Sequence, residues 1–568
     1  MTIMSVYKRK SSYLFILGLA VLLPILLYGL KEFVRAEIFT TDVTVGNSAP
    51  EFTDGPREDP TSSGTNPTNV GSNVTFEATA EDSNSEDYYL AICKTNSVTP
   101  VNGDAPTCGG GNWCISTVTT SGQEASCNYT ALIGDAESNA WFAFVCDDNA
   151  SAASCSTAEQ GSGDSGSPFK VNHAPTFSAI TDDGGTGANS GANPGGTMTF
   201  TATASDADSD TLQDTVKLVV CADTDGATAA GCAGVQICAS SFVASNPTCE
   251  LSIPAVAPDG SFNYYAYVFD NHSFGSASNY RSGEYVINNV APVVTAGTLN
   301  GGNDITLTEG DVTEVIVTAT VSDANSCQDL TTVDTSVYRT GITYTGCDTS
   351  GESDDNYCYG QITCTVVGGT CTGSTDSTAS YTCSVDIQYH ADPTIADTEY
   401  PTEEWIATIR AIDNNSASDT DDTAEVDMLT TVGIDIYNNV DSEPTLSFGS
   451  LDVGQKNDPL DKIMITEATG NVGINQELSG TDLDDGDTGV IDVGYQKYSL
   501  TVSTAYASGT SLTDTPALSL INVLKTTSSV SPATKNTWWG IEIPTGIPPG
   551  VYSGSNTSTA VMSDVLDW

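Results

Sequence analysis

The chain has 568 residues and a formal net charge of −56, because 73 acidic residues face only 17 Lys and Arg. Its acidic content is ordinary and its bases are depleted, so we expect no basic patch that could displace phosphate counterions, and hence no nucleic-acid partner. The 52 glycines, together with many Thr, Ser, Val and Asn, favour an extracellular β protein.

The N-terminus predicts export. Lys8, Arg9 and Lys10 precede an uncharged, mostly apolar stretch at 11–30, which is typical of an export signal whose N-terminus stays inside. Small residues at Val34 and Ala36 would suit signal peptidase, but the apolar stretch is also long enough to span a bilayer. We therefore predict a signal peptide or a single-pass signal anchor at 1–36, and its cleavage stays open. A pilin-type leader is the weaker alternative, since the glycine and glutamate expected around its cleavage point are missing beside Lys10.

Cysteines mark three copies of one module. Three pairs are each separated by six positions, and every pair has one cysteine upstream and one downstream, giving Cys93, Cys108, Cys114 and Cys127; Cys221, Cys232, Cys238 and Cys249; and Cys347, Cys358, Cys364 and Cys383. By position, Cys146 pairs with Cys155 and Cys327 with Cys371. After an export signal these cysteines predict disulfides within domains, with the connectivity inside each group of four left open. Zinc is disfavoured because the three histidines (His173, His272 and His390) are scattered.

Repeated junctions divide the chain. NSAP at 47–50, NHAP at 172–175, NVAP at 289–292 and, more loosely, NVDSEP at 439–444 recur at domain-sized spacing. We predict three disulfide-bearing domains at 37–174, 175–291 and 292–443, followed by a cysteine-free domain at 444–568.

Each of the first three copies predicts the same two strands. Segments 73–80, 197–204 and 314–321 alternate apolar and polar residues, so one face should be buried. The aromatic segments 140–147, 264–271 and 405–414 follow later in each copy, and their Trp141 and Trp405 are expected in cores rather than as carbohydrate platforms. No intervening segment has a helical period, so the fold class is all-β, with tandem β-sandwiches.

The order of junction, alternating strand, acidic turn (205–210) and aromatic strand resembles the cadherin-like and related immunoglobulin-like repeats of microbial surface proteins, over residues 47–443. The fourth segment, with Trp538, Trp539 and a Pro-Gly pair at 549–550, looks like a terminal sandwich of secreted microbial repeat proteins. The chain departs from true cadherins, because Asn172 and His173 stand where an acidic linker is expected and no Asp-Arg-Glu segment occurs.

Calcium is the metal that the sequence favours. Asp206, Asp208 and Asp210 place three carboxylates at alternate positions, as in hard-cation loops, with Asp214 nearby. The glycine and closing glutamate of an EF-hand are absent, so a calcium site and a solvated acidic turn both stay open. The acidic run at 482–487 is interpreted as a turn.

One motif imitates a catalytic serine. GDSGSP at 163–168 looks like the nucleophile segment of chymotrypsin-type proteases, but its nearest histidine, His173, follows it, whereas those proteases carry the histidine well upstream. We expect a linker here.

We therefore expect a non-enzymatic cell-surface or secreted rod that serves adhesion or cell-envelope structure. It would contact the membrane through its N-terminal segment and other surface proteins or glycans through its loops. The alternatives are a surface-layer or pilus-like assembly subunit and a carbohydrate-binding accessory protein.

Overall fold

The computed structural model describes residues 40–184, 191–208, 212–276, 279–347 and 354–568. The predicted signal segment and Asp210 lie outside these residues. Among the helices of the described residues, none is long and apolar enough to cross a membrane.

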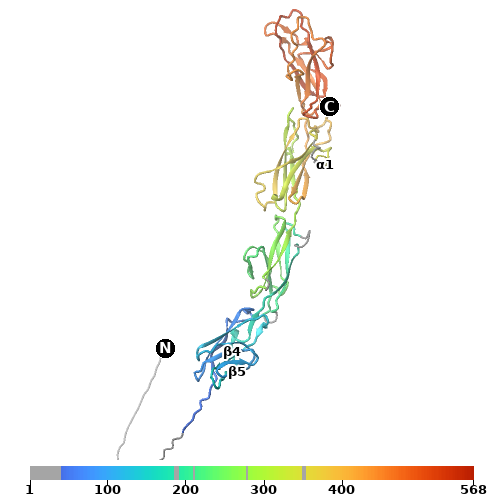
Figure 1. Cartoon of the computed structure of the whole chain (residues 1–568). Helices are drawn as coiled ribbons and strands as arrows, with labels where there is room; N and C mark the ends of the chain where they lie inside the picture. The colour runs from blue at the N-terminus through green and yellow to red at the C-terminus, as the bar shows by residue number, and fades with distance from the viewer. Residues whose placement is uncertain (1–39, 185–190, 209–211, 277–278, 348–353) are drawn as a thin grey trace, which may run out of the picture.

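Four β-sandwiches follow one another end to end as a slender rod, with the fourth at the end opposite the first (Figure 1). The all-β prediction and the tandem immunoglobulin-like arrangement are confirmed.

The first sandwich contains the 3-10 helix η1 (Gly163–Ser165) and the strands β1 (Glu51–Asp59), β2 (Thr68–Asn69), β3 (Asn73–Glu81), β4 (Tyr88–Cys93), β5 (Val98–Val101), β6 (Asp104–Cys108), β7 (Asn112–Ile115), β8 (Glu124–Thr130), β9 (Ser138–Asn139), β10 (Phe142–Asp147) and β11 (Phe169–Asn172). Its two main sheets have the orders β1-β3-β8 and β10-β4-β7. The alternation predicted in β3 is present, since Phe76 and its even-numbered neighbours are fully buried.

The second sandwich consists of β12 (Thr176–Asp182), β13 (Thr197–Ser205), β14 (Val216–Cys221), β15 (Ala227–Thr228), β16 (Gly231–Cys232), β17 (Gln236–Ala239), β18 (Thr248–Ser252), β19 (Gly260–Asp270) and β20 (Arg281–Ile287). Sheet β12-β13-β18 faces sheet β17-β14-β19-β20, and both sheets contribute to one core. This division of antiparallel strands between two sheets is that of immunoglobulin-like sandwiches.

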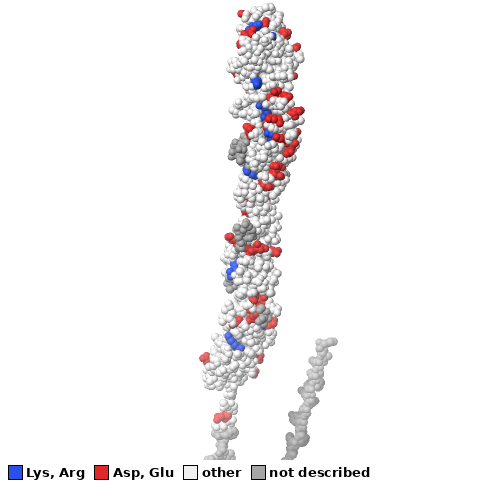
Figure 2. Space-filling model, turned by 90° about the vertical axis from the view of Figure 1, so that its right-hand side faces the viewer, with Lys and Arg blue, Asp and Glu red and all other residues white. Residues whose placement is uncertain are grey.

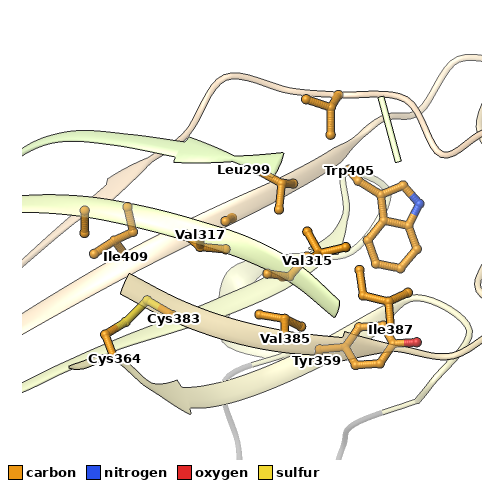
Figure 3. Close-up of a cluster of buried hydrophobic side chains, with 14 of the residues drawn as sticks. Leu299, Val315, Val317, Tyr359, Cys364, Cys383, Val385, Ile387, Trp405 and Ile409 are labelled. Carbon is orange, nitrogen blue, oxygen red and sulfur yellow. A yellow bond between two sulfur atoms is a disulfide. The ribbon is translucent and has the colours of Figure 1, made fainter. Parts of the chain in front are cut away.

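The third sandwich contains η2 (Asn300–Gly302), η3 (Cys327–Asp329), α1 (Tyr344–Cys347) and the strands β21 (Val293–Leu299), β22 (Thr313–Ser322), β23 (Leu330–Arg339), β24 (Cys358–Thr363), β25 (Thr365–Val366), β26 (Thr378–Ile387), β27 (Trp405–Asp413) and β28 (Ser418–Asp422). Sheets β21-β22-β26-β25 and β24-β23-β27-β28 enclose its core. Figure 3 shows Trp405 and Ile409 of β27 beside the aliphatic side chains of β22 and β26. Trp405 and Trp141 are both fully buried, so their predicted core role is confirmed.

The fourth sandwich contains η4 (Val493–Tyr495), η5 (Tyr506–Ser508), η6 (Val565–Asp567) and the strands β29 (Ile434–Asn438), β30 (Lys462–Ala468), β31 (Ile474–Gly480), β32 (Leu483–Asp484), β33 (Val490–Ile491), β34 (Gln496–Ser499), β35 (Thr510–Ser511), β36 (Ala517–Val523), β37 (Thr534–Ile541) and β38 (Asn556–Met562). Its sheets are β29-β30-β37-β34-β35 and β36-β31-β38. Because β29 pairs with β30, this sandwich begins before residue 444, and the boundary expected at 443/444 falls inside it. The loose junction motif at 439–444 is a turn after β29, not a link between sandwiches.

All 16 cysteines form disulfides within a sandwich, as predicted. In every copy the upstream cysteine joins the first member of the six-spaced pair and the second member joins the downstream cysteine. The bridges are Cys93–Cys108, Cys114–Cys127, Cys146–Cys155, Cys221–Cys232, Cys238–Cys249, Cys327–Cys371, Cys347–Cys358 and Cys364–Cys383. Disulfides persist in oxidising compartments, so these bridges are typical of an extracellular protein.

Candidate metal centres

Three clusters of carboxylates occupy equivalent places in the first three sandwiches. In each cluster, three carboxylate oxygens lie within 4.8 Å of one another. One carboxylate directly follows the alternating strand, one precedes the next strand, and one ends the aromatic strand. The sets are Asp82, Glu86 and Asp147; Asp206, Asp214 and Asp270; and Asp323, Asp329 and Asp413.

The second cluster lies where the first two sandwiches meet. The amide of Asn172, the last residue of β11, donates to Asp270 Oδ2 at 2.9 Å, so the first sandwich delivers a side chain into the cluster of the second. Asn172 Oδ1, Asp206 Oδ2 and Asp214 Oδ2 are buried without a hydrogen-bond partner. On its other oxygen, Asp214 lies 2.8 Å from His272 Nε2.

The third cluster lies where the second and third sandwiches meet. Asn289 of the linker donates to Asp413 Oδ2 at 2.8 Å. Buried oxygens without a partner are again Asn289 Oδ1, Asp323 Oδ2 and Asp329 Oδ2. Burial is the main cause that raises the pKa of Asp329, and the nearby charge of Asp259, in the second sandwich, raises it further.

The first cluster repeats this arrangement at the start of the rod. Asn47 donates to Asp147 Oδ2 at 2.8 Å, and Asn149 donates to Glu86 Oε1 at 2.6 Å. Asn47 Oδ1, Asp82 Oδ2 and Glu86 Oε2 are buried without a partner. The amide comes here from the segment that leads into the first sandwich, because no sandwich precedes it among the described residues.

Burial and mutual repulsion make it unfavourable for these carboxylates to be charged in the folded protein. Burial, with help from neighbouring carboxylates, raises the pKa of Asp214 to about 7. Burial is also the main reason that the pKa of Asp206 and that of Asp329 each rise to about 6, and it raises the pKa of Asp323 and Glu86. A buried oxygen without a partner costs about 1–3 kcal/mol, and more when charged. Three such oxygens recur at each place, so a bound group that satisfied them would stabilise the fold.

The donor set suits a hard divalent cation. Each cluster offers three carboxylates, with the buried, unpaired oxygen of a neighbouring asparagine amide beside them, and Ca²⁺ prefers all-oxygen ligand sets. Neither nitrogen nor sulfur is available in the triads for a zinc site.

The sequence pointed to Asp206 and to the nearby Asp214, but it did not join Asp270 or the two equivalent clusters to them. Asp206 belongs to the second cluster, but Asp208 does not: its Oδ1 lies 2.8 Å from His173 Nδ1, and its Oδ2 accepts from the His173 backbone. Asp210 lies outside the described residues. Asp208 is therefore not part of this triad, because the chain directs it towards the linker, and the third carboxylate is that of Asp270 at the end of β19.

The other sequence motifs are structural. Ser165 of the protease-like segment donates to the carbonyl of Ser162 at 3.3 Å, and the His173 ring is engaged by Asp208. In the 482–487 run, Asp485 accepts from the backbone amides of Asp487 and Gly489, which is a turn.

A different contact joins the third and fourth sandwiches. Lys525 Nζ of the fourth lies 2.9 Å from Asp392 Oδ1 of the third, and both side chains are 6% exposed. Arg339 Nε lies 3.2 Å from the other Asp392 oxygen, and Asn356 donates to the Thr527 carbonyl at 3.0 Å. Here fixed cationic side chains neutralise the buried carboxylate.

Comparisons with known proteins do not assign the chain to a family. No family model matches, and no curated protein matches. Among solved structures, a tetra-tandem repeat from the extending region of a large adhesion protein is 12% identical, with a TM-score of 0.28 over 86% of this chain and 96% of that one. The Escherichia coli adhesin FdeC is 12% identical, with a TM-score of 0.20 over 64% of this chain and 94% of that one. The fibronectin(III)-like modules of Clostridium thermocellum CbhA are 17% identical, with a TM-score of 0.19 over 41% of this chain and 93% of that one. Similarities this low carry no conclusion about function.

Proposed function

We propose that this protein is a non-enzymatic extracellular rod that serves adhesion or cell-envelope structure, and that calcium locks the ends of its first three sandwiches. One observation carries the proposal: the same buried, unpaired oxygens recur at three equivalent places. A single cluster would be a local accident, whereas three copies point to a common ligand.

The position of the clusters gives the ion a mechanical role. Asn172 and Asn289 come from the chain entering each sandwich, while the carboxylates belong to the sandwich itself. An ion that binds all of them ties two neighbouring bodies together. Without it, mutual repulsion of the carboxylates opposes the same contact, so the junction should loosen.

Small-angle X-ray scattering of the purified full chain tests this role, with calcium and then with chelator. We expect a longer and more uniform particle with calcium and a broader, more compact ensemble with chelator. Asp413→Asn should remove the calcium effect at the second junction, while Asp421→Asn, an exposed carboxylate of the same sandwich, should preserve it. Identical scattering in both conditions would reject the calcium lock, and particles that grow with protein concentration would favour the assembly-subunit alternative.

A further inference from the structure

The tip of the rod carries a polar cavity that the junctions do not use. β37 runs away from the third sandwich: the residue before it, Ala533, bonds to Ala468 near the Lys525 contact, and the strand ends at Ile541. Ile541 pairs with Gln496, and the cavity lies beside this pair. It has a volume of about 350 Å³ and is lined by Asp492, Gly494, Tyr495, Lys497, Tyr506 and Glu542.

A buried tyrosine holds the cavity wall. Tyr506 is 4% exposed, and its hydroxyl donates to the Tyr495 carbonyl at 2.7 Å. The Lys497 and Lys456 ammonium groups lie 4.8 and 5.6 Å from the centre of its ring, within range of a cation–π interaction. Asp492 accepts from the Gly494 amide at 2.8 Å. The polar groups are therefore placed before any ligand arrives.

Donors and acceptors stand apart across this cavity. Within the part of the chain that the structure describes, Lys497 forms no ion pair with a carboxylate, although Asp492 and Glu542 line the same space. Lys456, beside the same ring, lies 3.9 Å from Asp458 Oδ2, so Lys497 is the lysine that this cavity can offer to a ligand. Figure 2 shows basic side chains in the uppermost sandwich close to acidic ones.

We propose that this cavity binds a neutral mono- or disaccharide. A sugar hydroxyl both donates and accepts, so adjacent hydroxyl groups can donate to the carboxylates and accept from the lysine that line this space. The volume falls in the range of small-molecule sites, in which a few placed polar groups give specificity. The lining carries two carboxylates and one ammonium group, and the net charge of the chain is −56. Both repel anions, which favours a neutral sugar over an acidic one.

Binding of neutral and acidic saccharides to the full chain tests the site, first on a glycan array and then by titration calorimetry. We expect a neutral saccharide to bind. Lys497→Gln and Glu542→Gln should each weaken that binding about tenfold or more, because each removes a charged hydrogen-bonding group. Lys535→Gln, an exposed lysine of β37, is the matched control and should bind like the original protein.

Two further readouts keep the test decisive. Near-unchanged unfolding temperatures of the variants would separate lost recognition from lost folding. Chelator should leave binding unaltered, since no acidic triad lies in the described fourth sandwich, so this test is independent of the calcium lock. Absence of binding to any neutral saccharide at millimolar concentration, binding to acidic saccharides only, or equal binding by all variants would overturn the proposal.

Discussion

The first three sandwiches and the fourth are stabilised by different means. The first three carry every disulfide and all three carboxylate triads, whereas the fourth has no cysteine and meets its neighbour through buried Lys525. Both kinds of junction bury carboxylates. Under the proposed calcium lock, a fixed ammonium group offsets this electrostatic cost at one junction and an exchangeable ion offsets it at the others. Only the exchangeable ion would make a junction responsive to its surroundings.

Reduction should separate the two regions most strongly. Each bridge in a small domain contributes roughly 2–4 kcal/mol, and the first three sandwiches carry two or three bridges each. We expect a reductant to unfold or strongly destabilise these sandwiches and to leave the fourth folded. Hydrogen exchange of the backbone amides, measured separately for each sandwich, would test this. An equal loss of amide protection in the fourth sandwich would contradict the proposed difference between the two regions.

Substitution of Lys525 should damage only the distal junction. Lys525→Met removes one of the positive charges that neutralise buried Asp392. Breaking a buried ion pair in this way lowers the free energy of unfolding by about 3–5 kcal/mol. Arg339, which also contacts Asp392, would reduce that loss. Chemical denaturation with and without calcium would measure it: the loss should be equal in both conditions, and calcium rescue would show that the two kinds of junction are not distinct.

Removal of a carboxylate from one of the triads should lower stability when calcium is present and should not lower it in chelator. Asp323→Asn weakens calcium binding, so it should lower the stability of the third sandwich by about 3 kcal/mol when calcium exceeds its Kd a hundredfold. In chelator it removes repulsion in the cluster and should be neutral or stabilising. Denaturation of this variant beside Asp421→Asn would show the reversal, and a loss of equal size in both conditions would assign Asp323 a purely structural role.

The smallest effect is a pH dependence in chelator. The pKa of Asp206 rises from 3.8 to about 6 and that of Asp214 to about 7, so the folded state keeps protons that the unfolded chain releases. Stability contributed by these groups is then greatest below pH 4 and falls as pH rises to 7. Calcium should abolish this decline. Unfolding temperatures measured between pH 4 and 7 would test it, and matching slopes with and without calcium would refute it.

The sequence predicted most of the fold because the fold is repeated. Alternation in 73–80 and its two copies identified buried strands, and six-residue cysteine spacing identified three modules and the membership of each disulfide group. The start of the fourth sandwich was not predictable, since β29 has no counterpart of the NSAP-type junction and is recognised only by its pairing with β30.

The candidate site was only partly accessible from sequence. Asp206 and the nearby Asp214 stood out in a local acidic run, yet their partner Asp270 comes from a distant part of the chain. A comparison of all three copies would have found Asp270, because Asp147, Asp270 and Asp413 each end the aromatic strand. The burial that separates Asp270 from an exposed turn aspartate depends on packing between sandwiches, which no local pattern encodes.

Cation stoichiometry tests the central claim most directly. Native mass spectrometry of the full oxidised chain, with calcium added after exhaustive chelation, should show three specifically bound ions. Asp82→Asn, Asp206→Asn and Asp323→Asn should each remove one, and Asp421→Asn none. Absence of specific binding, or a count that these substitutions leave unchanged, would contradict the account.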